Sequence, residues 1–587
     1  MKKPLTKNGK KAVAVIVILI LAFIYYYVEL PAINIHSVGF WEFLILAAVV
    51  IVFILTILPK LKHSSKANPP DLSPKHDKRL KKGLLCIGFL VGVFLLGALL
   101  SSPIVNASKY QQLLTVQDRE FTNDIKQISY DEIPLLDSDS AALLGNRKMG
   151  SMVDMVSQFE VSNTYTQINY HNSPVRVAPL QYADPIKWLT NQSNGIPAYI
   201  LIDMATQDTE LVKLDQPIKY SESEYFNRNI YRHLRFHYPT YIFDNINFEL
   251  DENGTPWWVC PVKGFTIGLF GGQTVERVVL CNAQTGECQD VSVGDVPQWV
   301  DRVYSSSLLT SYYNYYGTLK HGFLNSVFGQ KDCLKTTDGY NYLALDDDVW
   351  LYTGVTSVTG DQSIVGFVLM NQRTGETHFY SVQGAVESSA MSSAEGQVQN
   401  LGYKATFPLL LNTADQPTYF IALKDNSGLV KKYAMVNVQK YQIVAIGDTV
   451  AECEKKYVSL MAQNGISGGT VNTTLNDKKI TGTIRKMAQS VLDGNSHYYL
   501  LLDSSSSLFD VPVSQDLNVL RYSEGNRITL TYTPPEDGSA DGVCTVTGIV
   551  KDSAGSSNPS STAPTSSTGA TTSSTASATE STSSTTK

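Results

Sequence analysis

Two histidines, His233 and His237, stand four residues apart, so one face of a helix would carry both rings. Paired imidazoles at this spacing are half of a zinc site. No glutamate stands between them in the His-Glu-x-x-His sense, and no third ligand is evident. Because Arg232 and Arg235 flank the pair, the favoured interpretation is two histidines on the side of an amphipathic helix, with no metal.

Two of the seven cysteines, Cys281 and Cys288, flank a six-residue turn and would face each other across a β-hairpin. Neighbouring strand positions meet disulfide geometry only in favourable pairings. The pattern therefore predicts either a Cys281–Cys288 disulfide or two free, half-buried thiols. Six cysteines follow residue 104, far fewer than in a disulfide scaffold, and neither C-x-x-C nor a Cys/His zinc spacing occurs.

Other chemically suggestive stretches have simpler interpretations. Asp346, Asp347 and Asp348 lack the alternate spacing and downstream Glu of a calcium loop, which favours a solvated turn. Residues 264–272 are glycine-rich but contain neither G-x-G-x-x-G nor a Walker lysine, which favours a long loop between strands. Neither Gly-x-Ser-x-Gly nor a Ser-x-x-Lys with its companion motifs stands out. We therefore predict no catalytic, cofactor-binding or metal residue, and no enzyme.

Three hydrophobic runs precede all of these residues, at 12–28, 41–58 and 83–100. At about 1.5 Å rise per residue, each is long enough to cross a hydrocarbon core of roughly 30 Å. A cleaved signal peptide is the alternative for the first run. It is disfavoured because no small-residue cleavage site follows and two more runs do. The sequence predicts a three-span membrane anchor.

Basic residues set the predicted orientation. Residues 29–38 contain no Lys or Arg, whereas the N-terminus and residues 60–82 are rich in Lys, and the second segment adds Arg79. By the positive-inside rule the N-terminus and the 60–82 loop are cytoplasmic and the 29–38 turn is outside. Everything after about residue 104 is then extracellular, and the chain is a multi-pass protein of the cell membrane.

A repeated turn organises the exported part. Residues 279–287 recur as residues 368–376, an offset of 89 residues. In each copy an aliphatic strand ends at Asn282 or Asn371, whose side chain can bond the backbone two residues on. Gly286 or Gly375 then supplies the positive φ that the turn requires. A degenerate third copy ends at Asn437, and a fourth is predicted to begin at Pro197.

Helical patterns separate these hairpins. One follows the Ser221–Glu224 capping box and stops at Pro239, and another begins at the Thr449–Glu452 capping box and stops at Gly465. Two more are predicted over residues 296–304 and 384–401. Such units each present an apolar face that needs a neighbour. The fold class is therefore α+β, with antiparallel hairpins packed on single helices.

Helix, strand and a strand that ends in an N-x-x-T-G-E turn together resemble the PepSY domain, the peptidase-propeptide and YpeB-type repeat. The resemblance covers residues 190–465 and rests on short turns. It implies a non-catalytic module of exported bacterial proteins that binds or inhibits peptidases or other envelope partners. The chain departs from the pattern because no peptidase domain accompanies the repeats.

Five strand-like stretches follow between residues 478 and 550, and their order and size are similar to a small OB-type barrel, with a β-sandwich as the alternative. No stripe of aromatic and basic residues supports nucleic-acid binding, and the net charge of −7 argues weakly against it. Residues 553–587 are almost wholly Ser, Thr, Ala, Gly and Pro, which predicts a disordered tail.

The predicted organisation has six parts: anchor 1–104, stalk or first subdomain 105–190, PepSY-like units 191–305 and 306–465, OB-like domain 474–552, and tail 553–587. The predicted function is a non-catalytic, membrane-anchored surface protein of a Gram-positive bacterium. It would bind or regulate an envelope protein, such as a peptidase. The alternatives are a cell-wall enzyme, and an extracellular sensor that relays through its spans.

Overall fold

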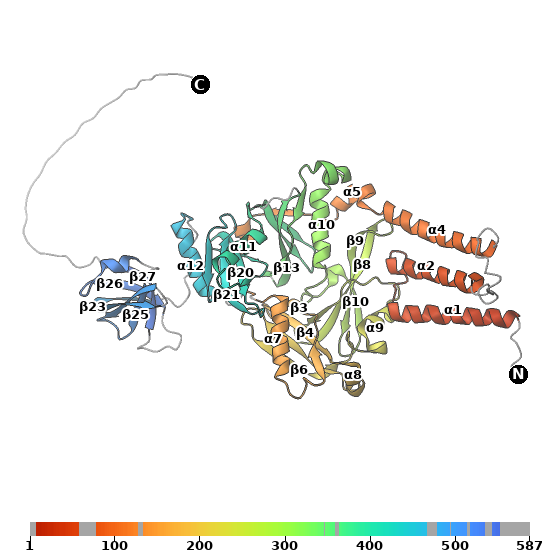
Figure 1. Ribbon diagram of the computed structural model, residues 1–587, viewed down its shortest axis with the longest axis horizontal. Coiled ribbons are helices and arrows are strands. Elements are labelled where there is room, and N and C mark those ends of the chain that lie inside the picture. The colour runs from red at the N-terminus through yellow and green to blue at the C-terminus, as the bar shows by residue number, and fades with distance from the viewer. Residues whose placement is uncertain are drawn as a thin grey trace, which may run out of the picture. The chain divides into compact units, whose positions relative to one another are not determined.

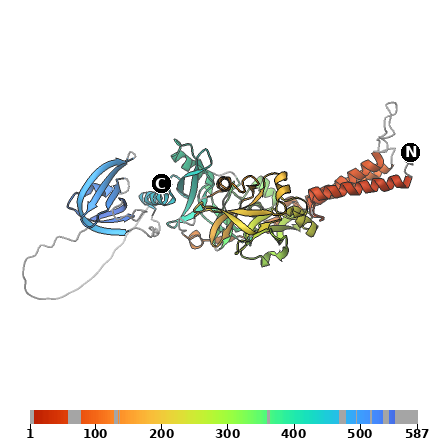
Figure 2. The same cartoon turned by 90° about the horizontal axis from the view of Figure 1, so that it is seen from below.

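The computed structural model (Figures 1 and 2) describes residues 7–57, 78–126, 133–134, 136–345, 347–358, 363–466, 478–492, 495–513, 517–533 and 543–551. The chain divides into two compact domains, Met1–Val471 and Asn472–Lys587. The predicted tail at 553–587 and most of the predicted cytoplasmic loop at 60–82 lie outside the described residues.

Three apolar helices begin the first domain and run side by side in both views (Figures 1 and 2). They are α1 (Lys7–Glu29), α2 (Val38–Val52), which continues as the π-helical turn η1 (Phe53–Ile57), and α4 (Lys78–Leu100). Within the described residues, Val38–Thr56 and Lys78–Leu100 are long and apolar enough to cross a membrane, whereas the apolar stretch Val15–Glu29 is shorter.

Four units of one helix and one antiparallel sheet follow. A short segment of α5, β1 and α6 leads into them. The bounds of this segment and of the first two units are α5 Pro103–Gln111, β1 Gln117–Arg119, α6 Phe121–Asp124; α7 Ser138–Gly150, β2 Phe159–Val161, β3 Thr166–Tyr170, β4 Ser173–Tyr182, α8 Pro185–Asn191, β5 Ile196–Asp203, β6 Thr209–Ile218; η3 Phe226–Arg228, α9 Ile230–His237, β7 Asn247–Leu250, β8 Pro256–Ile267, β9 Gly271–Asn282, β10 Cys288–Ser292 and η4 Val293–Asp295. The sheet orders are β2-β4-β5-β6, with β3 on β4, and β10-β9-β8-β7.

The third and fourth units repeat this plan. Their bounds are α10 Ser306–Thr318, η5 Asn325–Gly329, β11 Leu334–Thr336, β12 Asn341–Leu345, β13 Asp348–Ser357, β14 Ser363–Ile364, β15 Gly366–Asn371, β16 Thr377–Tyr380; β17 Gly384–Ala385, α11 Glu387–Gln397, β18 Lys404–Ala405, β19 Leu409–Thr413, β20 Gln416–Lys424, β21 Val430–Asn437, β22 Val444–Gly447 and α12 Val450–Gln463. Strand β1 adds to the third sheet, parallel to β16.

The predicted turn is present in all four units. Asn282 and Asn371 each accept backbone N–H bonds from the second and third residues that follow. Asn437 and Asp203 do the same in the fourth and first units. Gly286 and Gly375 have φ angles of 77° and 78°. The same local interaction therefore stabilises the turn in every repeat: a side-chain carbonyl or carboxylate oxygen accepts hydrogen bonds from backbone N–H groups of the turn.

The first repeat begins elsewhere than predicted. In the second unit the residue after the turn asparagine, Ala283, donates to the carbonyl of Pro256 on the preceding strand. The matching bond in the first unit runs from Met204 to Pro174. The prediction that this copy begins at Pro197 is wrong, because Pro197 lies on the strand that carries the turn.

Neighbouring units share their cores. Cys281 packs in one core with Ile200 of the first unit, while the adjacent residue Leu280 packs in another with Val368 of the third. Leu369 in turn belongs to a core shared with the fourth unit. Successive strand residues point to opposite faces, so each sheet is covered on both sides and needs a neighbour on each.

Two predicted helices differ from the structure, for the same physical reason: the first begins late, although it ends before Pro239 as predicted, and the second is absent. Ser221 and Glu224 do not cap a helix; α9 begins at Ile230, and Asn229 caps it by accepting a bond from the N–H of Arg232. Residues 296–305 contain no α-helix, and the N–H groups of Val303 and Tyr304 both donate to the carbonyl of Gln372. In both segments tertiary contacts replace the bonds of a local helix.

The helices predicted at 384–401 and 448–464 are present as α11 and α12. Thr449 caps α12 by accepting from the N–H of Glu452, and the Glu452 carboxylate accepts from the N–H of Asp448. Residues 138–191, within and just beyond the stretch assigned to a stalk or first subdomain, form α7, β2, β3, β4 and α8 of the first unit.

The second domain of the chain is a closed five-stranded barrel with the order β23-β24-β25-β27-β26. Its strands are β23 Lys478–Leu492, β24 Asn495–Leu502, β25 Leu508–Pro512, β26 Arg527–Thr533 and β27 Val543–Lys551, with the 3-10 helix η6 Leu517–Arg521 before β26. The long strand β23 pairs with β24 and with β26, and its register shifts between Ile484 and Lys486. The five predicted strands are confirmed.

Candidate functional site

The turn between α1 and α2 is bonded to the loop that follows α9. The N–H of Ile33 donates to the carbonyl of Pro239 over 2.7 Å, and the Asn34 side chain donates to the carbonyl of Thr240 over 3.0 Å. From α9, the Arg235 guanidinium donates to the carbonyl of Leu30 over 2.8 Å. The 29–38 turn and the helix–sheet units therefore lie on the same side of the anchor.

The tip of the β8–β9 hairpin packs against the anchor helices. The N–H groups of Leu269 and Phe270 both donate to the Ser101 hydroxyl, over 2.7 and 3.0 Å. The Phe270 ring centroid lies 5.1 Å from that of Phe94 on α4 and 6.5 Å from that of Trp41 on α2. The β8–β9 hairpin thus contacts two of the three apolar helices, α2 and α4, directly.

A glycine admits this hairpin tip. A Cβ at Gly97 on α4 would lie 2.8 Å from the Leu269 side chain, so a larger residue there would displace the tip.

The long loop predicted for residues 264–272 is wrong, because β8 continues to Ile267 and β9 begins at Gly271. Gly268 and Gly272 have φ angles of 63° and 59° and close the short turn.

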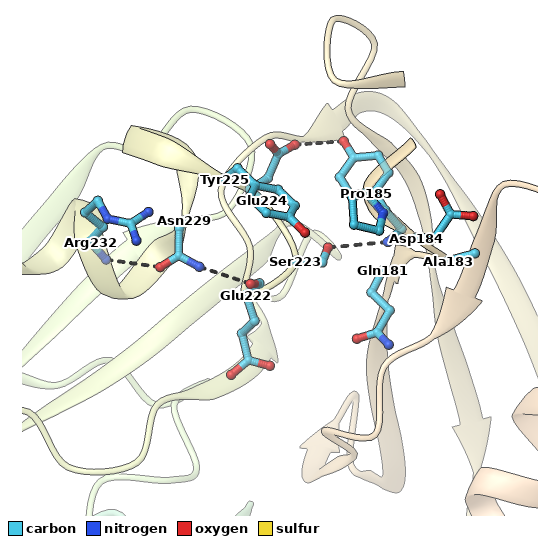
Figure 3. A pocket seen from close by; sticks show the side chains of 11 residues that line it. Gln181, Ala183, Asp184, Pro185, Glu222, Ser223, Glu224, Tyr225, Asn229 and Arg232 are labelled. Atoms are coloured by element: carbon cyan, nitrogen blue, oxygen red, sulfur yellow. Dashed lines mark hydrogen bonds between the residues drawn. The ribbon is translucent and has the colours of Figure 1, made fainter. Parts of the chain in front are cut away.

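A groove of about 470 Å³ opens beside this junction (Figure 3). Residues 222–225 and the start of α9 form one wall, and residues 181–185 after β4 form the other. Arg232 links the groove to the anchor, because its guanidinium lies over the Tyr27 ring at 4.4 Å and donates to the Tyr27 carbonyl over 3.4 Å. The groove therefore reaches the end of α1.

Two carboxylates organise the groove. Glu224 accepts hydrogen bonds from the Tyr182 hydroxyl at 2.7 Å and from the Trp188 indole at 2.8 Å. Glu222 accepts from the Tyr231 hydroxyl at 2.5 Å. Burial and the bonded Glu224 carboxylate raise the pKa of Tyr182. These bonds fix the walls, which explains why Glu224 is not free to cap a helix.

Exposed apolar side chains follow the groove-lining residues Pro185 and Tyr225 in the chain. Ile186 and Leu189 on α8 have 69% and 62% of their surface exposed, and Phe226 has 62%. The Trp188 ring holds Tyr225 and Phe226 together, with ring centroids 4.6 and 5.9 Å away. Grouped apolar side chains around a polar floor are typical of interaction surfaces.

A second cavity of about 570 Å³ lies at the edge of the third sheet. His378 lines this cavity, with Nε2 at 2.8 Å from Glu376 and Nδ1 at 3.9 Å from Asp124. The Tyr380 hydroxyl donates to Asp124 over 2.9 Å. The described residues that line this cavity include no Ser, Thr or Cys, so covalent catalysis by such a nucleophile has no candidate there.

Two carboxylates are buried where three units meet. Glu249 on β7 has no exposed surface and accepts from the N–H groups of Asp301 and Arg302. Burial raises its pKa to about 7. Asp301 accepts from the N–H of Asn169, and burial together with the neighbouring Glu249 raises its pKa as well. The arrangement ties β3, β7 and the loop before α10 through charges that are costly to bury.

These carboxylates predict a pH dependence of stability. Folded Glu249 holds its proton at higher pH than the unfolded chain does, so the free energy of unfolding should fall as pH rises from about 4.5 to about 7, by on the order of 2–3 kcal/mol. Glu249→Gln should reduce this slope, because a neutral amide does not titrate in this range. Thermal unfolding across this pH range checks the expectation. The exposed Glu210→Gln is the control, and an unchanged slope in Glu249→Gln would contradict it.

The sequence-predicted candidates are brought together in part. Cys281 and Cys288 lie directly opposite each other on β9 and β10, as free thiols with Sγ atoms 2.8 Å apart. The disulfide therefore stays a prediction. His233 lies above them on α9, with Nε2 at 2.8 Å from the carbonyl of Gly286. This convergence could not be predicted from the sequence, because His233 is 48 residues from Cys281.

Electrostatics at this cluster favour charged partners. Hydrogen bonding to Cys281, with His233 and His237 nearby, lowers the pKa of Cys288 to about 6, although burial opposes the change. Burial disfavours a charged His233, but bonds to Cys288 and the Gly286 carbonyl raise its pKa above the usual value. The Cys288 thiolate and the imidazolium of His233 stabilise each other.

The solvated turn predicted for the acidic run is wrong at Asp348, where strand β13 begins. Asp348 is buried and pairs with Arg373, with the guanidinium Nε 2.6 Å from its carboxylate. It also accepts from the Asn371 side chain over 2.8 Å. Asp347 has a φ angle of 66°, and Asp346 lies outside the described residues. The aspartate nearest the strand supports the repeated turn.

Comparison with protein-family models finds no family that matches the chain, and a search of curated proteins finds no match either. Neither the helix–sheet units nor the barrel is assigned to a family by these comparisons. The resemblance of the repeats to the PepSY domain accordingly stays a prediction.

Proposed function

We propose that this chain is a non-catalytic, membrane-anchored surface protein of a Gram-positive bacterium that binds a protein partner through the groove of Figure 3. One observation carries the proposal: the groove is open, exposed apolar side chains lie next to its lining residues in the chain, and Arg232 connects it to Tyr27 at the end of α1. A partner held there would be an envelope protein close to the membrane surface, such as a peptidase.

Three spans, with the N-terminus in the cytoplasm, form the proposed topology. Its support is the absence of Lys and Arg from residues 29–38 and the abundance of Lys before α1 and in residues 60–82. The contacts of Leu30, Ile33 and Asn34 with the loop after α9 also require that turn and the sheet units to share one side. That side is the extracellular one in this proposal.

The PepSY-like interpretation and the OB-type interpretation belong to the same proposal. The four helix–sheet units, each with an Asn or Asp turn, support a tandem array of interaction modules. The order of the barrel strands, with β25 and β27 parallel and the other pairs antiparallel, supports a Greek-key barrel of the OB type.

A single labelling experiment tests partner and topology together. Phe226→Cys, treated on intact cells with a membrane-impermeant maleimide that carries a photoreactive benzophenone, should be labelled and should form a cross-linked adduct after illumination. Leu401→Cys, an exposed position on the fourth unit, should be labelled without that adduct. The parent chain gives the background from its own cysteines.

Two outcomes would overturn these proposals separately. Labelling of both variants only after lysis would place the sheet units in the cytoplasm and contradict the topology. Labelling on intact cells with the same adducts from both positions would leave the topology intact and remove the groove as the partner site.

Direct contact between the β8–β9 hairpin and the anchor favours a second candidate, an extracellular sensor. A ligand-induced shift of the hairpin would move Leu269 and Phe270 against α2 and α4. Residues 60–82 are too short to hold an output domain, so a cytoplasmic partner would have to receive the signal.

A further inference from the structure

Three potential metal ligands converge where α9 lies against the turn between β9 and β10, and a second imidazole lies one helical turn away. One ligating nitrogen of His233 and the Sγ atoms of Cys281 and Cys288 all lie within 4.8 Å of one another. The His237 ring, one helical turn further along α9, has its centroid 4.2 Å from that of His233. Two elements far apart in the sequence thus supply two imidazoles and two thiols.

The local fold explains this convergence. Asn282 donates its N–H to the carbonyl of Glu287, so Cys281 and Cys288 form the adjacent non-hydrogen-bonded pair, in which side chains lie closest. Gly286 admits the Tyr220 ring, from which a Cβ would lie 2.3 Å, and the Tyr220 ring centroid lies 4.5 Å from that of His233. His233 and His237 share one helix face because they are four residues apart.

We propose that His233, His237, Cys281 and Cys288 bind one zinc ion. Two thiolates and two imidazoles are a common ligand set for structural zinc, which binds them in tetrahedral geometry. Histidines at i and i+4 on one helix provide a bidentate half of the site. The thiol pair supplies the third and fourth ligands that the spacing of the histidines alone did not reveal.

Zinc would require a small adjustment of the thiols. With Zn–S bonds of about 2.3 Å at a tetrahedral angle, the two sulfurs stand about 3.8 Å apart. Their present separation of 2.8 Å can open by rotation of the half-buried Cys288 side chain. Binding would link α9 to the second sheet, in the same region that α9 links to the anchor through Arg235.

The competing state of the two sulfurs is the disulfide predicted from sequence, and the two states exclude each other. A disulfide would remove both sulfurs as metal ligands. The convergence of the imidazoles on the thiols therefore favours a metal site, and this inference stands whether or not the groove binds a partner.

Metal content of the full-length protein tests the proposal. The protein is purified in detergent through a tag without histidines, reduced with a phosphine, incubated with Zn²⁺ and desalted, and zinc is measured by mass spectrometry. We expect one zinc per chain, and the loss of that zinc in the double variant Cys281→Ser/Cys288→Ser. His237→Ala should bind zinc more weakly. Cys453→Ser, which changes a buried thiol on α12, should keep full occupancy.

Cobalt provides a second measurement that a merely unfolded variant cannot imitate. Co²⁺ bound in the parent should give thiolate-to-metal charge-transfer absorption, and Cys288→Ser alone should reduce it while circular dichroism stays that of the parent. Zinc retained by the double variant would overturn the proposal. A Cys281–Cys288 disulfide in protein isolated from cells, with no zinc bound after reduction, would overturn it as well.

Discussion

We expect Asn371→Ala to lower the free energy of unfolding by about 2–4 kcal/mol. Asn371 is only 2% exposed, and its carbonyl oxygen accepts from the N–H groups of Arg373 and Thr374. Its amide donates to Asp348, which also pairs with Arg373. Alanine would leave two turn donors unpaired and remove one donor from a buried carboxylate.

The matched control is the same substitution in the second unit. Asn282→Ala removes the same two backbone contacts from a more exposed turn, so its cost should be near 1–2 kcal/mol. Thermal unfolding of the full-length protein in detergent, followed by tryptophan fluorescence, measures both; Trp350 lies directly opposite Asn371. Equal losses in the two variants would mean that Asp348 adds nothing to the third turn.

These two turns also show which parts of the structure could be predicted. Asn282 and Gly286 act within six residues, so their pattern alone specified the turn, its positive φ and the hairpin. The helix α12 was predictable for the same reason, because Thr449 and Glu452 cap it locally. Hydrogen bonds between residues that are close in the chain can therefore be predicted from the sequence.

Contacts between residues that are far apart in the chain cannot be predicted in this way. Glu224 carries the pattern of a capping residue, yet Tyr182 and Trp188 bind it from another segment. The groove, the buried Glu249–Asp301 pair and the approach of His233 to Cys281 all depend on how units stack. A single sequence names their residue types but cannot say which of them meet.

The hairpin contact with the anchor leads to the second large effect. Ser101 is 2% exposed, and its hydroxyl is the acceptor for the N–H groups of Leu269 and Phe270. Ser101→Ala removes this acceptor and leaves two donors facing an apolar helix surface. We expect amide hydrogen exchange at these two positions to become about 10–100-fold faster, because opening the tip would cost about 1.4–2.8 kcal/mol less.

Hydrogen exchange of the full-length protein in lipid nanodiscs, measured by mass spectrometry on peptides that cover residues 265–273, checks this expectation. Ser102→Ala is the matched control, because its hydroxyl donates to the carbonyl of Leu99 within the same segment. Faster exchange in Ser101→Ala alone would show that α4 holds the hairpin tip, as a sensor that relays through its anchor requires. Equal exchange in both variants would mean that the Ser101 hydrogen bonds do not hold the tip, and the sensor candidate would lose its strongest support.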